Sequence, residues 1–219
     1  MAKKLATLTI VLLFAAAIPF SYTYVRGLSD FATAEERIEA AVASGKAVLD
    51  FSDLAYLQKV PASIHRIEKL WHFRASSAKR LSNIDALAGL KNIRNLQLAD
   101  TRVTDLSPLA RLPGLEVLDI RDTWVADLAP LAAAPKLRWL QMNGTAVKSL
   151  CPLNKVSRLA WLNVHKSYSE DGSQDCYNAL KRRVAELNGG TAFQQNYIPG
   201  DKYKRKVAFD RFLQKIEWL

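Results

Sequence analysis

The sequence predicts an α/β solenoid of stacked repeats, and two observations lead to that prediction. An apolar pattern begins at residues 93, 115, 137 and 159, so each copy starts 22 residues after the one before it. Hydrophobic residues make up 49% of the 219-residue chain, which is enough to bury a real core. Repeats of this length cannot bury an apolar face alone and are stable only when they stack on their neighbours.

Residues 1–26 have the sequence of an export segment. Lys3 and Lys4 precede an apolar run from Leu5 to Val25, whose 21 residues are close to the roughly 20 needed to span a bilayer. Three interpretations remain: an uncleaved signal anchor, which the length favours, a cleaved signal peptide, and a buried core helix, which would not explain the lysines. The first two place the rest of the chain outside the cytoplasm, in the periplasm or the extracellular space, either membrane-anchored or secreted.

Residues 27–47 are predicted to form an N-terminal helical cap. Thr33 and Glu36 have the spacing of a capping box, and the residues after them have a helical pattern that stops at Gly45. We expect this helix to cover the open edge of the first repeat.

The repeats span residues 48–167, with three full copies and weaker units at both ends. The common spacing is Leu-x-x-Leu-x-Leu-x-x-Thr-x-Val-x-Asp-Leu-x-Pro-Leu, which resembles the bacterial, internalin-like class of leucine-rich repeats. The resemblance implies a curved solenoid with one short parallel strand per repeat on its concave face and short helical or 3-10 turns on its convex face. The chain departs from the class at Thr101, Thr123 and Thr145, where many members have asparagine. We expect these hydroxyls to bond backbone groups between repeats.

One polar residue recurs at the same place in successive repeats. Asn83, Asp105, Asp127 and Ser149 occupy this place, and all four are residue types that cap the start of a helical turn. The aspartates also suggest a metal or acid-base site, but capping explains four equivalent polar residues with no ligand. We therefore expect caps on the convex turns.

Successive side chains along a strand point to opposite faces of the sheet, so one face of each predicted strand is left toward solvent. Equivalent positions on that face stack into columns from repeat to repeat. The first column places Trp139 beside Trp161, both facing solvent and bordered by amides, a combination that suits a protein hot spot or sugar stacking. The candidate partner-binding residues are Asp119, Arg121, Trp139, Gln141, Asn143, Trp161, Asn163 and His165. Two alternatives to a binding role for the tryptophans remain. A C-terminal helix could fold over them, or the assignment of side chains to the two faces of each strand could be shifted by one residue.

Residues 168–219 are predicted to form a C-terminal cap and tail. The stretch from Cys176 to Leu187 has an amphipathic helical pattern and ends before a pair of glycines. Cys151 and Cys176 are the only cysteines in the chain. In an exported domain they favour a disulfide between the last full repeat and its cap over two free thiols.

The tail after residue 197 is basic and amphipathic. Its first charges are Lys202, Lys204, Arg205 and Lys206, and aromatic and aliphatic residues follow them. Such a segment can lie on anionic lipid, dock a partner, or pack on the solenoid with its lysines in water.

No residues for catalysis, a cofactor or a metal ion are recognisable in the sequence. The three histidines have no metal-binding spacing, Ser44-Gly45-Lys46 lacks the rest of a P-loop, and no G-x-S-x-G motif is present. The excess of 31 basic over 21 acidic residues attracts anionic partners without selecting among them.

The sequence therefore predicts a non-catalytic module outside the cytoplasm that binds a protein partner through its concave face. A glycan or an anionic membrane surface is a further candidate ligand, and no nucleic acid is expected. The alternative is a structural or envelope-associated protein whose basic tail binds anionic lipid or polymer. An enzyme-linked sensor without its partner domain is a third class.

Overall fold

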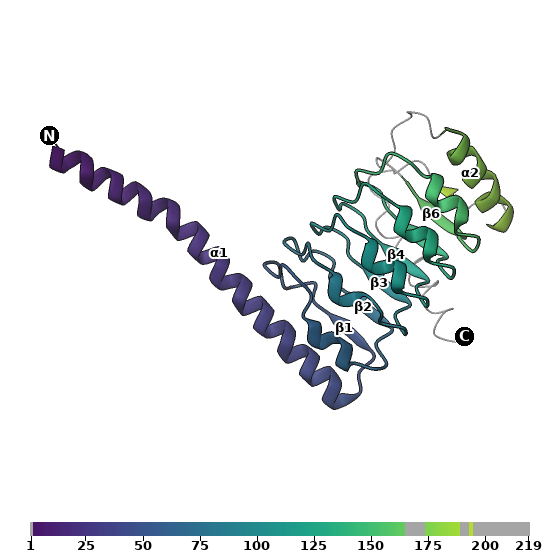
Figure 1. Cartoon of the computed structure of the whole chain (residues 1–219), viewed down its shortest axis with the longest axis horizontal. Helices are drawn as coiled ribbons and strands as arrows, with labels where there is room; N and C mark the ends of the chain where they lie inside the picture. The colour runs from purple at the N-terminus through teal and green to yellow at the C-terminus, as the bar shows by residue number, and fades with distance from the viewer. Residues whose placement is uncertain (1, 165–173, 189–192, 195–219) are drawn as a thin grey trace.

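The computed structural model describes residues 2–164, 174–188 and 193–194, and it shows a stack of short strands and turns (Figure 1). The strands form one sheet in the order of the sequence, each parallel to its neighbours. They are β1 Val48–Asp50, β2 His72–Arg74, β3 Asn95–Gln97, β4 Val117–Asp119, β5 Trp139–Gln141, β6 Trp161–Asn163 and β7 Phe193–Gln194. The prediction of an α/β solenoid with short parallel strands is confirmed.

The strands pair in the register that the 22-residue period predicts. Leu118 lies opposite Leu96 on one side and Leu140 on the other, and all three side chains are fully buried. These leucines belong to a single core that runs from Ala34 to Leu180. Each repeat thus contributes one layer to a continuous apolar interior.

The convex turns are 3-10 helices, as the resemblance implies. They are η1 Ala62–Arg66, η2 Asp85–Leu87, η3 Ser107–Arg111, η4 Ala129–Ala133 and η5 Cys151–Lys155.

The recurring polar residues accept backbone hydrogen bonds at the start of four of these turns. Asp105 Oδ1 accepts from the Ser107 N–H at 2.7 Å, and Asp127 Oδ1 accepts from the Ala129 N–H at 2.8 Å. Asn83 and Ser149 do the same in their own repeats. Each acceptor lies one residue before the N-cap position and closes a tight turn with the N–H two residues later. The prediction that these residues cap the helical turns is wrong, because the N-cap residues are Ile84, Leu106, Leu128 and Leu150, and they make no side-chain cap hydrogen bond.

Replacing Asp127 with alanine should lower the free energy of unfolding by about 1 kcal/mol, because the N–H of Ala129 loses its acceptor. Urea unfolding measures the change. Asp127→Asn is the matched control, since an amide oxygen can accept the same bond, and it should stay close to wild type. Equal losses in both variants would mean that the carboxylate charge, and not the hydrogen bond, stabilises the turn.

The threonine hydroxyls bond within their own repeats. Thr101 Oγ1 donates to the carbonyl of Leu98 at 2.7 Å, and Thr123 Oγ1 donates to that of Ile120 at 2.7 Å. The expectation that these bonds join neighbouring repeats is wrong, because the short side chain reaches only the carbonyl three residues earlier. The hydroxyls stabilise the bend after each strand.

The N-terminal helix α1 is longer than predicted, extending from Ala2 to Ser44 (Figure 1). The predicted capping box is wrong, because Thr33 lies inside the helix and its hydroxyl donates to the carbonyl of Ser29. The helix does end at Gly45, which has a positive φ of 66° and donates its N–H to Val42. Among the described residues, we find no helix that combines the length and the apolar character needed to cross a membrane.

Buried residues in the last part of α1 close the first repeat. Ala34, Ile38 and Ala41 are buried in the common core. Arg37 donates to both carboxylate oxygens of Asp53, each at 2.6 Å, and so ties the helix to the turn after β1.

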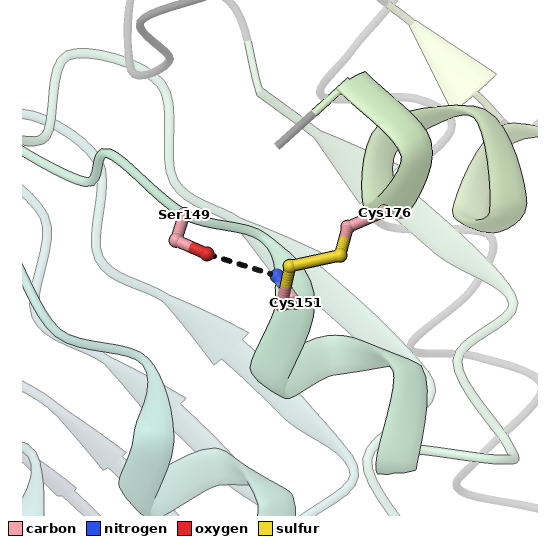
Figure 2. The surroundings of a disulfide bond; sticks show 3 residues. All are labelled: Ser149, Cys151 and Cys176. Carbon is pink, nitrogen blue, oxygen red and sulfur yellow. Dashed lines mark hydrogen bonds between the residues drawn. A yellow bond between two sulfur atoms is a disulfide. The ribbon is translucent and has the colours of Figure 1, made fainter. Parts of the chain in front are cut away.

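Helix α2, Gln174–Asn188, packs at the other end of the stack. Its Tyr177, Leu180 and Val184 are buried, and the disulfide predicted between Cys151 and Cys176 is present, with their Cα atoms 5.0 Å apart (Figure 2). The prediction of a helix after Cys176 linked to the last full repeat is confirmed.

Candidate functional site

The concave face carries an apolar cluster that is separate from the main core. Strand pairing sets Val117 beside Trp139 and Trp139 beside Trp161. The two indole rings stack with their centroids 3.9 Å apart and their planes within 9° of parallel. The tryptophans are therefore adjacent, as the predicted columns require.

The exposure of this cluster differs from the sequence expectation. Only 6% of Trp139 and 0% of Val117 is exposed, and Trp161 is half-buried. The expectation that Trp139 faces solvent is wrong, because strand alternation determines which face a side chain occupies but not whether that face is covered. The predicted site residues Asp119, Gln141 and Asn163 are buried as well.

Two charged candidates on this face bind one another. Arg121 donates from Nε to Asp119 Oδ1 at 2.8 Å and from Nη2 to Asp119 Oδ2 at 2.6 Å. Asn143 is half-buried. His165 and the basic residues Lys202, Lys204, Arg205 and Lys206 lie outside the described residues.

Three further buried residues on β2 and β3 have polar atoms without hydrogen-bond partners. They are His72 at Nε2, Asn95 at both side-chain atoms and Gln97 at Nε2. Gln97 does accept a bond at Oε1 from Arg74 Nε, 3.1 Å away. A buried polar group left unpaired costs on the order of 1–3 kcal/mol, so such a group in a native structure calls for an explanation.

These three residues were not among the predicted site residues. Their only sequence signal is position: His72 and Asn95 share the column of the tryptophans, and Gln97 shares the column of Gln141. A polar residue type at a column position gives no indication that its side chain is buried. The sequence therefore did not identify His72, Asn95 and Gln97 as site residues.

The imidazole of His72 is held neutral. Burial, with a smaller contribution from the positive charge of Arg74, lowers its pKa from 6.5 to about 4, while Asp50 opposes the shift. Because the unfolded chain binds the proton more readily, the stability that depends on neutral His72 is complete above pH 6.5 and is lost as the pH falls toward 4.

Between pH 7 and pH 5 the free energy of unfolding should fall by about 2 kcal/mol through this residue alone. Urea unfolding of wild type and of His72→Gln at the two pH values measures the effect, since the variant lacks the titrating group. The matched control is His65→Gln, at an exposed position. An equal pH response in wild type and His72→Gln would show that His72 is not buried neutral.

Trp124 is a surface feature that the sequence columns did not identify. It follows β4 and is 67% exposed, although its backbone N–H donates to the carbonyl of Val103. It lies just after the turn that follows β4, outside the predicted columns of the concave face. Among the described residues, no group of three or more histidine, cysteine, aspartate or glutamate side chains could hold a metal ion.

The fold and this face together define a leucine-rich-repeat solenoid, a class that generally serves as a protein-interaction module. A family model described as Leucine Rich repeats (2 copies) matches residues 91–133. Among solved structures, internalin C2 from Listeria monocytogenes strain 4b F2365 is similar at 24% identity and a TM-score of 0.51, over 62% of this chain and 55% of that one. The expected resemblance to internalin-like leucine-rich repeats is confirmed.

Two other solved structures are similar over a large part of the chain. Internalin F from the same Listeria strain shows 20% identity and a TM-score of 0.45, over 74% of this chain and 56% of that one. A leucine-rich-repeat protein from Leptospira interrogans shows 15% identity and a TM-score of 0.46, over 65% of this chain and 38% of that one. The chain thus spans little more than half the length of either internalin, and no curated protein matches it.

Proposed function

We propose that this protein is a non-catalytic interaction module outside the cytoplasm and that it binds a protein partner with the concave face of its solenoid. The observation that carries the proposal is the group of unpaired polar atoms on His72, Asn95 and Gln97, on the same face as the stacked Trp139 and Trp161.

A polypeptide fits this combination of groups. The Asn95 amide offers one donor and one acceptor side, which matches the N–H and C=O of a peptide backbone. The stacked indoles supply a flat apolar area of the kind that dominates binding energy at protein interfaces. Because these side chains are buried, a partner lying across the strands would contact both ends of the face only after they become accessible.

The location outside the cytoplasm is supported by two features. The disulfide between Cys151 and Cys176 is a bond that persists in oxidising compartments. Lys3 and Lys4 before the apolar run have the order of an export signal. Protease treatment of intact cells, followed by fractionation, should find the solenoid on the outer side of the membrane, tethered by residues 1–26 or released after cleavage. In cells whose outer membrane has been made permeable, protection of the solenoid until the inner membrane is lysed would contradict export.

The binding role is tested by cross-linking the full-length protein in its native membrane and identifying attached proteins by mass spectrometry. The double substitution Trp139→Ala and Trp161→Ala should lose the partner, because alanine at an aromatic hot spot weakens binding by about 30-fold or more. Trp124→Ala is the matched control and should retain it. Capture that is equal in all three proteins would overturn the proposal.

The competing function predicts a different result. If the protein binds anionic lipid or polymer through its tail, neutralising Lys202, Lys204, Arg205 and Lys206 should abolish association instead, with strong salt dependence. The two sets of variants therefore separate the two classes of function.

A further inference from the structure

Exposed apolar side chains gather where α1 leaves the solenoid. The described residues include six large hydrophobic side chains that are exposed, and four of them lie on this part of α1. They are Tyr22, Tyr24, Val25 and Leu28, each more than half exposed, and the other two are Val48 and Trp124. Single exposed apolar residues are normal, whereas a contiguous group marks a surface that another body covers.

The directions of these four side chains favour a lipid bilayer as that body. Successive residues of an α-helix are turned by about 100°, so Tyr22 and Tyr24 point to nearly opposite sides of α1, with Val25 and Leu28 in the arc between them. A protein surface would cover one side of the helix, whereas lipid surrounds it. The helix has no break between these residues and the apolar run that begins at Leu5. Tyrosine is enriched where such a helix crosses the membrane interface.

The loop after β1 lies beside the same part of α1. Asp30 Oδ2 accepts from the Tyr56 N–H at 2.7 Å, and the rings of Tyr22 and Tyr56 meet edge to face with their centroids 6.3 Å apart. A Cβ added at Gly27 would lie 3.4 Å from the Tyr56 carbonyl oxygen, so helix and loop are in close contact. Strand β1 starts just after α1 ends, and the loop after it returns to the middle of the helix. The strand therefore runs back along α1.

The loops that follow the strands, here called the exit loops, all lie on one edge of the solenoid. Because every strand is parallel to β1, they point to the side on which the N-terminal half of α1 projects (Figure 1). Gly27 is about 7–8 Å along the helix axis from Tyr22, at a rise of about 1.5 Å per residue. With Tyr22 at the boundary of the hydrocarbon core, the exit loops lie at the depth of the lipid headgroups, a layer roughly 5–7 Å thick.

Charge distinguishes the first two exit loops, residues 51–61 and 75–84, from the next two, residues 98–106 and 120–128. The charged residues of the first two are Asp53, Lys59, Lys79 and Arg80. Those of the next two are Asp100, Arg102, Asp105, Arg121, Asp122 and Asp127. Asp53 is paired with Arg37, and Lys79 lies 3.8 Å from Asp100 of the following loop. Positive charge is therefore in excess next to α1, where attraction to lipid phosphate is strongest.

Two guanidinium groups in this region lie over tyrosine rings. Arg80 Cζ is 5.4 Å from the ring centroid of Tyr56, and Arg26 Cζ is 5.4 Å from that of Tyr22. Each pair combines a ring that suits the membrane interface with a guanidinium that can bond both oxygens of a phosphate.

We propose that residues 22–28 of α1 and the first two exit loops dock on a bilayer surface of anionic phospholipid. The inference rests on the tether in the proposed function and adds an orientation to it. The strands stand upright on the membrane, and the concave face opens sideways. A partner approaches that face parallel to the membrane surface.

Photo-crosslinking of the full-length protein in bilayers of equal parts phosphatidylcholine and phosphatidylglycerol tests this orientation. A photoreactive amino acid in place of Gln58, exposed in the first exit loop, should form lipid adducts that mass spectrometry detects. The same group in place of Lys136, exposed before β5 at the other end of the strands, should form several-fold fewer. Equal yields at the two positions would overturn the inference, whether or not any charge variant folds.

Charge variants test the role of the first two exit loops. With Lys79→Gln and Arg80→Gln together, the adduct yield at position 58 should fall several-fold at low salt, because each basic residue contributes about fivefold to binding at an anionic surface. The matched control, Lys69→Gln with Lys91→Gln, removes the same charge from exposed positions before β2 and β3 and should keep the yield. A yield that is unchanged in the first variant, or equally high in phosphatidylcholine alone, contradicts docking on anionic lipid.

A protein that covers this surface would give a different result. In intact cells, cross-links from position 58 to a protein without lipid adducts would replace the bilayer with a protein interface and overturn the inference. Reconstituted bilayers contain no partner, so missing adducts there contradict the docking alone. Equal partner capture by wild type and by the double variant at Trp139 and Trp161 contradicts the concave-face function alone.

Discussion

Replacing Phe73 with alanine should lower the free energy of unfolding by about 3–5 kcal/mol, because the substitution leaves a cavity that the stacked repeats cannot close. Phe73 is fully buried on β2, and its ring meets that of Phe51 edge to face at a centroid distance of 5.3 Å. The two rings join neighbouring repeats at the start of the main core. Urea unfolding followed by far-ultraviolet circular dichroism measures the loss.

Trp124→Ala removes an aromatic ring of larger size from an exposed position and is the matched control for that measurement. It should change the free energy of unfolding by less than about 0.5 kcal/mol, as surface substitutions usually do. If both variants lost the same amount, burial of Phe73 would not be the source of its effect.

Removing the disulfide with Cys151→Ser and Cys176→Ser should cost about 3.5 kcal/mol in the chain-entropy model, because the bond closes a loop between residues 25 apart. The loss should be largest at the end of the solenoid. Hydrogen exchange should therefore speed up in α2 and η5 before it changes in β3 and β4.

Wild-type protein treated with a reductant is the control for the serine variants. It should unfold at the same urea concentration as the double variant, since both lack the same bond. A double variant as stable as untreated wild type would show that the buried residues Tyr177, Leu180 and Val184 hold the cap without the disulfide.

The repeat made most of the fold predictable. Residues 22 apart must occupy equivalent places, so the pairing of Leu96 with Leu118 and of Trp139 with Trp161 followed from the period alone. The disulfide was predictable because the chain has only two cysteines, one in the last full repeat and one in its cap.

The start of the N-terminal helix and the exposure of the candidate site residues were less predictable. The Thr33 and Glu36 pair has capping-box spacing, but the helix continues through it, and the Thr33 hydroxyl donates to the carbonyl of Ser29 one turn earlier instead of capping a helix start. The burial of Trp139 depends on what lies over the sheet, and a strand pattern contains no information about a neighbouring layer. For the same reason, the unpaired atoms of Asn95 became visible only in the structure.

The two end caps also control how many repeats follow one another. Each repeat has two complementary edges, so an uncovered last repeat could pair with the first repeat of another molecule. Head-to-tail contacts of this kind grow into open filaments. Helix α1 covers one edge with Ile38, and α2, fastened by Cys176, packs over the other. The two caps therefore cover the edges through which one solenoid could otherwise stack on another.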